Sequence, residues 1–156
     1  MKLILPRPVD IKFPISSPFG ERVLRGETLF HKGIDFEVPV GTKVYAVADG
    51  RVVRSGWENP DYKKKGFGLR VMQNITIGAV NFFCWYSHLS EAMVKDGDHV
   101  TQGQLIGLSG NTGHSTGPHL HFGIRIFPYR RTDGWGGFVD PSPLMKPEDL
   151  LFPAAS

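Results

Sequence analysis

The stretch Gly117-Pro118-His119-Leu120-His121-Phe122-Gly123-Ile124-Arg125-Ile126 places two histidines two residues apart, in a run that ends in alternating β-branched residues. Such alternation is typical of a strand, in which residues i and i+2 point to the same face. His119 and His121 are therefore predicted to face one way, and Leu120, Phe122 and Ile124 the other way, into a core. Two imidazoles on one face indicate either a metal site or two exposed strand histidines, and the pair alone does not decide between them.

The composition around this stretch favours one β-rich domain. The chain has 156 residues with 19 glycines and 12 prolines, which suits short strands joined by turns better than a helical bundle. No apolar run approaches the ~18 residues that a membrane-spanning helix needs. The apolar start ends at Pro6 and Arg7, too early for an export signal. The expectation is therefore a protein that works where it is made, is released by another agent, or lacks its true N-terminus here.

The cysteine count limits the kinds of site that are possible, and the net charge limits the kinds of partner. Cys84 is the single cysteine, which excludes an internal disulfide and a cysteine-based zinc knuckle. The net charge of +3 favours anionic partners, and an acidic wall polymer would suit as well as nucleic acid. The basic clusters Lys63-Lys64-Lys65 and Arg130-Arg131 are interpreted as solvated loop charges. Since no nucleic-acid motif accompanies them, no nucleic-acid partner is expected.

Turn residues divide the chain into a series of short segments. We predict a compact, mostly antiparallel β domain over residues 16–127, with an extended N-terminal arm over 1–15. A Gly/Pro-rich arm over 128–156 is expected to pack on the domain. The expected strands are 44–48 and 51–54 joined in a hairpin at Asp49-Gly50, then 69–77, 79–88 and 105–108, with a polar loop over 55–67 and a single helical turn over 90–94.

Three segments carry groups that could hold a metal. His31 and Asp35 are four residues apart, but Gly33 between them argues against a helix and favours a bend that brings both side chains to one point. His88 ends an aromatic strand. A zinc site with three protein ligands and an open position is typical of hydrolases. These groups, with His119 and His121, supply three ligands and a base with His88 or His119 left over, so a metal hydrolase competes with structural histidines and with a binding function.

Three motifs together resemble the lysostaphin-type (M23) zinc metallopeptidases. They are Phe30-His31-Lys32-Gly33-Ile34-Asp35-Phe36, Tyr86-Ser87-His88-Leu89-Ser90, and the run from Gly113 to Phe122. The resemblance extends over about residues 16–127 in the family's order, although Gly123 replaces a common acidic residue. It implies a duplicated hybrid β fold with a groove. It also implies one Zn²⁺ held by His31, Asp35 and His121, with His88 and His119 as the catalytic pair.

The resemblance further implies a zinc-dependent endopeptidase that cuts peptides of bacterial peptidoglycan at the cell wall. We expect a monomer that reaches the wall as a phage lysin does or after loss of an export signal. The alternatives are a non-catalytic activator of the same fold and a structural wall-binding component of a phage particle. The residues interpreted as substrate contacts are Arg22, Tyr86, Asn111, Thr112, Ser115 and Thr116.

Overall fold

The computed structural model describes residues 4–127 and 137–149, and within them nearly all regular structure is strand. None of the helices in these ranges is long and apolar enough to cross a membrane. The elements are β1 (Ile15–Ser17), β2 (Gly20–Leu24), β3 (Glu27–His31), β4 (Ile34–Phe36), β5 (Lys43–Tyr45), β6 (Gly50–Trp57), β7 (Leu69–Ile77), β8 (Val80–Ala92), β9 (His99–Val100), β10 (Leu105–Ser109), β11 (Leu120–Phe127), β12 (Phe138–Val139) and the 3₁₀ turns η1 (Ser142–Leu144) and η2 (Pro147–Asp149).

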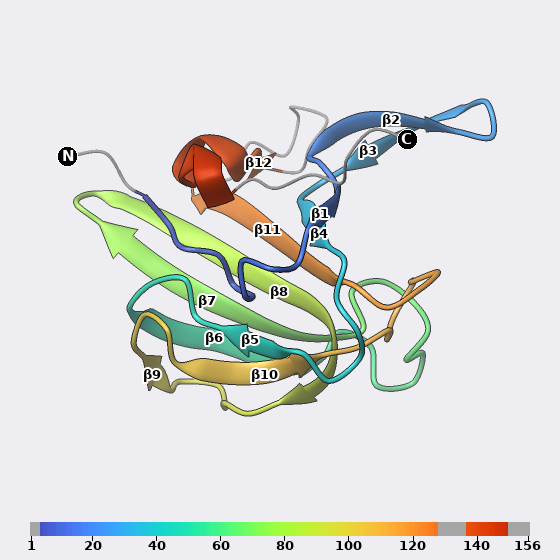
Figure 1. Cartoon of the computed structure of the whole chain (residues 1–156). Helices are drawn as coiled ribbons and strands as arrows, with labels where there is room; N and C mark the ends of the chain where they lie inside the picture. The colour runs from blue at the N-terminus through green and yellow to red at the C-terminus, as the bar shows by residue number, and fades with distance from the viewer. Residues whose placement is uncertain (1–3, 128–136, 150–156) are drawn as a thin grey trace.

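One antiparallel sheet carries most of these strands in the order β1-β4-β11-β8-β7-β6-β9. β10 pairs with the end of β8 and with β5, so the β5–β10 pair lies in front of β6 and β7 (Figure 1). β12 pairs with β11, and β2 and β3 form a separate hairpin that projects from the body (Figure 1). The predicted mostly antiparallel β fold is therefore confirmed, and β8 lies in the middle of the strand order.

The core is one buried cluster to which the sheet, the β5–β10 pair and the N-terminal segment all contribute. Leu120, Phe122 and Ile124 are fully buried there, as the alternation along β11 predicted. A buried polar contact joins the two layers, because the Tyr86 hydroxyl accepts a hydrogen bond from the Val47 amide at 3.0 Å. The same hydroxyl donates to Gln73 Oε1 at 2.7 Å, and the Gln73 amide donates to the Ala48 carbonyl. Tyr86 is thus fixed in the core.

Two local predictions are wrong. Asp49-Gly50 does not close a hairpin, because β5 pairs with β10 while β6 pairs with β7 and β9. The segment 90–94 is not helical, since β8 continues to Ala92 and pairs there with Gly107. The turn of the β2–β3 hairpin is formed by Arg25 and Gly26, both with positive φ.

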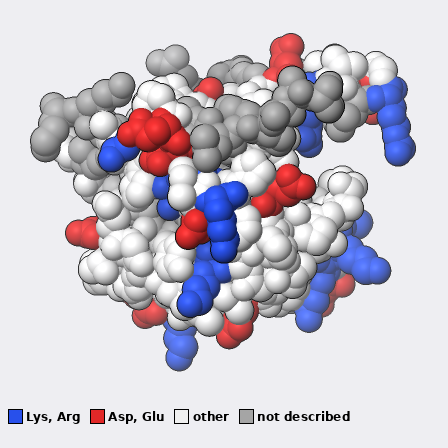
Figure 2. Space-filling view, viewed as in Figure 1, with Lys and Arg blue, Asp and Glu red and all other residues white. Residues whose placement is uncertain are grey.

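The two ends of the described chain meet. Leu5 pairs with Met145 in an isolated bridge, and its amide donates to the Leu144 carbonyl at 2.6 Å. Arg7 donates to the Ile11 and Phe13 carbonyls, and its guanidinium lies over the Phe36 ring. The part of the predicted C-terminal arm over residues 128–136 and 150–156 lies outside the described residues. On the face seen in Figure 2, basic and acidic side chains are interspersed.

Candidate metal centre

Strand register brings the three predicted ligands together. His121 on β11 stands directly opposite Asp35 on β4, and β3 ends at His31 just before the turn into β4. Gly33 makes that turn possible. A Cβ atom there would lie 2.4 Å from the Phe122 carbonyl oxygen and 2.7 Å from His121 Nε2, distances that no real Cβ tolerates. The bend predicted between His31 and Asp35 is therefore present, and it requires a glycine at position 33.

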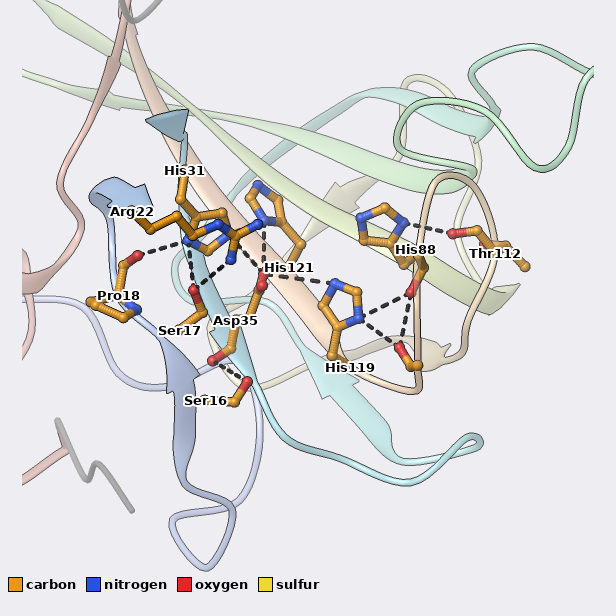
Figure 3. A network of polar contacts seen from close by, with 12 residues as sticks. Ser16, Ser17, Pro18, Arg22, His31, Asp35, His88, Thr112, His119 and His121 are labelled. Carbon is orange, nitrogen blue, oxygen red and sulfur yellow. Dashed lines mark hydrogen bonds and ion pairs between the residues drawn. The ribbon is translucent and has the colours of Figure 1, made fainter. Parts of the chain in front are cut away.

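Three electron-pair donors meet at one point (Figure 3). His31 Nε2 lies 3.1 Å from Asp35 Oδ1 and 3.2 Å from His121 Nδ1, and the last two atoms are 2.9 Å apart. All three residues are buried. The His31 tautomer follows from its other nitrogen, because Nδ1 lies 2.7 Å from the Pro18 carbonyl, which can only accept. Neutral His31 therefore presents a lone pair at Nε2.

This donor set fits a single divalent cation. Zinc with nitrogen and oxygen ligands at about 2.0–2.1 Å in tetrahedral geometry separates the ligand atoms by roughly 3.3 Å. The observed separations of 2.9–3.2 Å are close to that value. Burial alone would raise the pKa of Asp35. The adjoining His121 and His31 imidazoles outweigh it and hold that pKa well below its usual range, so a carboxylate is available as a ligand.

Two further imidazoles stand beside this cluster. The rings of His88 and His119 are 4.7 Å apart, and His119 Nε2 lies 3.7 Å from Asp35 Oδ1. Each ring is fixed through Nδ1. His119 donates to the Gly117 carbonyl at 2.8 Å, and His88 to the Thr112 carbonyl at 2.6 Å. Both imidazoles therefore keep Nε2 as the nitrogen left to exchange a proton.

The backbone that holds His88 is irregular. Leu69 pairs with Leu89 but Val71 pairs with Tyr86, so β8 has an extra residue at this point, and His88 has a φ of 61°. Burial lowers the pKa of His88 to about 4, and the neighbouring His119 charge acts in the same direction. His88 is therefore a neutral imidazole at neutral pH, as a proton acceptor must be.

A groove of about 740 Å³ opens over these side chains. Its walls come from β1, the β2–β3 hairpin, the end of the loop that follows β6, and the loop before β11. Three of the predicted substrate contacts line it, namely Arg22, Ser115 and Thr116. His114 also lines it. The groove further includes Ser17, Leu29, Phe30, Lys32, Glu37, Gly66, Phe67 and Pro118.

The other predicted substrate contacts lie elsewhere. Tyr86 is fully buried in the core, and the extra residue in β8 explains the error because it breaks the two-residue parity between Tyr86 and His88. Asn111 is exposed but is not among the groove-lining residues. Thr112 is also not among the groove-lining residues, but it supports His88. Its hydroxyl donates to the Leu89 carbonyl at 2.7 Å while its own carbonyl holds His88.

Phe67 is a groove residue that the sequence did not reveal. Its ring lies 5.7 Å from the His121 ring and 6.4 Å from the His88 ring, so it contacts both histidine groups. Its carbonyl accepts the His88 amide at 2.9 Å, and its amide donates to the Glu58 carboxylate at 2.7 Å. The available signal was an aromatic residue flanked by two glycines at the end of a polar loop.

Comparison with known proteins places this geometry among peptidases. The family model for Peptidase family M23 matches residues 29–134. The glycyl-glycine endopeptidase ALE-1 of Staphylococcus capitis is 41% identical over 118 residues, covering 74% of this chain and 29% of that protein. The peptidoglycan DD-endopeptidase ShyA of Vibrio cholerae is 44% identical over 122 residues, covering 76% of this chain and 26% of that protein. The chain thus spans between a quarter and a third of the length of these curated relatives.

A solved structure has the same extent as this chain. The catalytic domain of lysostaphin from Staphylococcus simulans superposes with a TM-score of 0.69 at 36% identity. The match covers 85% of this chain and 91% of that domain. The likeness therefore concerns one whole catalytic domain as well as part of several longer proteins.

Proposed function

This chain belongs to peptidase family M23, and we propose that it is a zinc-dependent endopeptidase that hydrolyses peptide bonds of bacterial peptidoglycan. One observation carries the proposal. Three lone-pair donors converge within 3.2 Å of one another, next to two imidazoles whose Nδ1 atoms are committed to backbone carbonyls. A cation-binding cluster combined with proton-exchanging groups is the equipment that peptide hydrolysis requires.

His31, Asp35 and His121 are proposed to hold one Zn²⁺ through Nε2, Oδ1 and Nδ1. A zinc ion held there supplies Lewis acidity, which activates water and polarises the scissile carbonyl group. One carboxylate and two neutral imidazoles around a divalent ion would leave the complex with a formal charge of +1. Burial of all three residues strengthens these electrostatic interactions, because the local dielectric constant is lower than that of water.

His88 and His119 are proposed to move protons. Because each donates Nδ1–H to a carbonyl, each offers an Nε2 lone pair to the groove. One of the two accepts the proton lost by the attacking water, and the single Nε2–H formed in this way can donate to the oxyanion and then deliver the proton to the leaving amine. The low pKa of His88 keeps it neutral at physiological pH, which suits proton acceptance.

The substrate is proposed to lie along the groove between Arg22 on the hairpin side and Ser115 and Thr116 on the opposite wall. The relatives differ in the bond named for them, glycyl-glycine in one and a DD-linkage in another. For this chain we propose the shared substrate class, the peptide part of peptidoglycan, with the protein acting as a monomer at the cell wall.

Purified peptidoglycan incubated with the zinc-loaded protein tests the proposal. We expect new amino termini in the soluble fraction, located by mass spectrometry of the released fragments. The His119→Ala variant is the control and should release none. Binding to the wall without any released fragment, by protein that contains stoichiometric zinc, would favour the non-catalytic alternatives instead.

A further inference from the structure

The segment that follows β1 reaches back to one of the proposed ligands. His31 Nδ1 lies 2.7 Å from the Pro18 carbonyl and 3.3 Å from Ser17 Oγ. Arg22 lies on β2 and donates from Nη1 to the same Ser17 Oγ at 2.8 Å. In Figure 3 dashed lines join His31 to Pro18 and to Ser17, and Arg22 to the same Ser17. A guanidinium, a hydroxyl and an imidazole therefore form one chain of contacts that ends at His31.

The Ser17 oxygen has the right neighbours to fix an imidazole. It receives N–H groups from both Arg22 and His31, so the His31 proton is kept at Nδ1 and the lone pair at Nε2. Ser17 is itself fixed, since it stands opposite Asp35 in the β1–β4 register. The same short segment therefore determines the relative position of two proposed ligands.

Arg22 has a geometric reason to act through Ser17. Within the described residues its hydrogen bond goes to Ser17, five positions earlier, although the side chain is exposed and would otherwise be free to rotate. This contact ties β2 to the end of β1 and so closes the turn at Pro18, whose carbonyl is the shorter partner of His31. Loss of the guanidinium would loosen both acceptors of the His31 proton at once.

We propose that Arg22 is a positioning residue that holds His31, through Ser17 and the Pro18 turn, with Nε2 directed at the metal. This inference rests on the proposed metal centre and adds a role for Arg22 other than substrate contact. Groups that orient a ligating histidine through its second nitrogen change metal affinity by about 10- to 100-fold when they are removed.

The test measures metal affinity rather than hydrolysis. Zn²⁺ affinity is determined by competition with a chromophoric chelator for the full chain and for Arg22→Gln, Ser17→Ala and the double variant. We expect each single variant to bind Zn²⁺ about 10-fold more weakly. The double variant should be little weaker than either, because the two residues act in series. Arg22→Lys keeps a donor and should recover most of the affinity.

The matched control is Arg25→Gln, which removes an exposed arginine from the turn of the same hairpin without touching Ser17. It should leave Zn²⁺ affinity unchanged. Unchanged affinity in Arg22→Gln, or an equal loss in Arg25→Gln, would overturn the proposal. Reduced hydrolysis with normal affinity would do the same and make Arg22 a substrate contact. If the unaltered protein binds no zinc, the proposed function fails first, and the two failures are thereby distinguished.

Discussion

The three proposed ligands and the two proposed catalytic histidines share one groove, yet different kinds of backbone hold them. Asp35 and His121 lie on paired strands, directly opposite one another, and His31 is the last residue of a third strand. His88 occupies an irregular position in β8 with positive φ, and His119 precedes β11 in an isolated bridge with Gly110. Regular strand pairing thus places the proposed ligands, whereas irregular backbone places the two proposed catalytic histidines.

The difference follows from what each group must do. Ligands have to remain within about 2 Å of an ion, so regular hydrogen-bonded strands, the most rigid support available, suit them. The pair must present Nε2 towards a substrate above the sheet, which strand alternation alone does not achieve for residues on separate strands. Carbonyls from one loop, at Thr112 and Gly117, fix both imidazoles instead.

The largest contrast is expected from removal of the imidazoles. His121→Ala should lose both bound zinc and hydrolysis, because it removes a ligand from the centre of the cluster. His119→Ala and His88→Ala should each keep near-stoichiometric zinc while hydrolysis falls by about 10²–10⁴-fold. Elemental analysis beside a peptidoglycan-release assay measures both quantities. If His119→Ala empties the site, the division between ligands and pair is wrong.

Substitution of two glycines, one beside the proposed ligands and one beside His88, should affect zinc binding and hydrolysis differently. Gly33→Ala places a Cβ against the Phe122 carbonyl and His121, whereas Gly110→Ala places one 2.6 Å from the Ser90 amide and 3.0 Å from the His88 carbonyl. Each should lower the free energy of unfolding by about 3 kcal/mol or more. Gly33→Ala should also weaken zinc binding, and Gly110→Ala should reduce hydrolysis at normal zinc content.

Denaturant unfolding of the two glycine variants measures the loss. Gly117→Ala is the control, since its φ is not positive and no atom lies within 4 Å of the added methyl group. A control as unstable as Gly33→Ala would mean that the whole region rejects side chains.

In protein freed of metal by a chelator, lowering the pH should reduce the free energy of unfolding through His88. The pKa of His88 is about 4 in the fold and about 6.5 when unfolded, so the unfolded chain takes up the proton first. The contribution of His88 is complete above pH ~6.5 and is lost as the pH falls towards 4, by roughly 3 kcal/mol in total. Urea unfolding between pH 7 and 4 should show a shallower loss in His88→Asn. The exposed loop variant His114→Asn should follow the unaltered protein.

The smallest expected effect tests the backbone of His88 directly. A residue with a side chain at φ 61° costs roughly 1 kcal/mol relative to glycine. His88→Gly should therefore be more stable than His88→Ala by about 1 kcal/mol, although both lack the imidazole. At His119, whose φ is not positive, the order should reverse because glycine is the more flexible in the unfolded state. Thermal unfolding of the four variants gives the comparison.

Residue types and short spacings predicted much of the site. Gly33 between His31 and Asp35 indicated a bend, and alternation after Pro118 separated the buried residues of β11 from its histidines. These are local patterns, and local sterics enforce them. The prediction for Tyr86 did not anticipate the extra residue in β8. The prediction for Thr112 did not anticipate its contact with His88, because that contact uses a backbone carbonyl, which every residue type has.

The sequence by itself therefore determined which side chains are available, that the fold is a sheet, and where the chain must bend. Only the tertiary structure decided which nitrogen of each imidazole is free, that β5 pairs with β10, and that Phe67 lies against His88 and His121. The reason is physical. Alternation and turns depend on neighbours in the chain, whereas pairing partners and carbonyl contacts depend on segments brought together from 20 to 90 positions away.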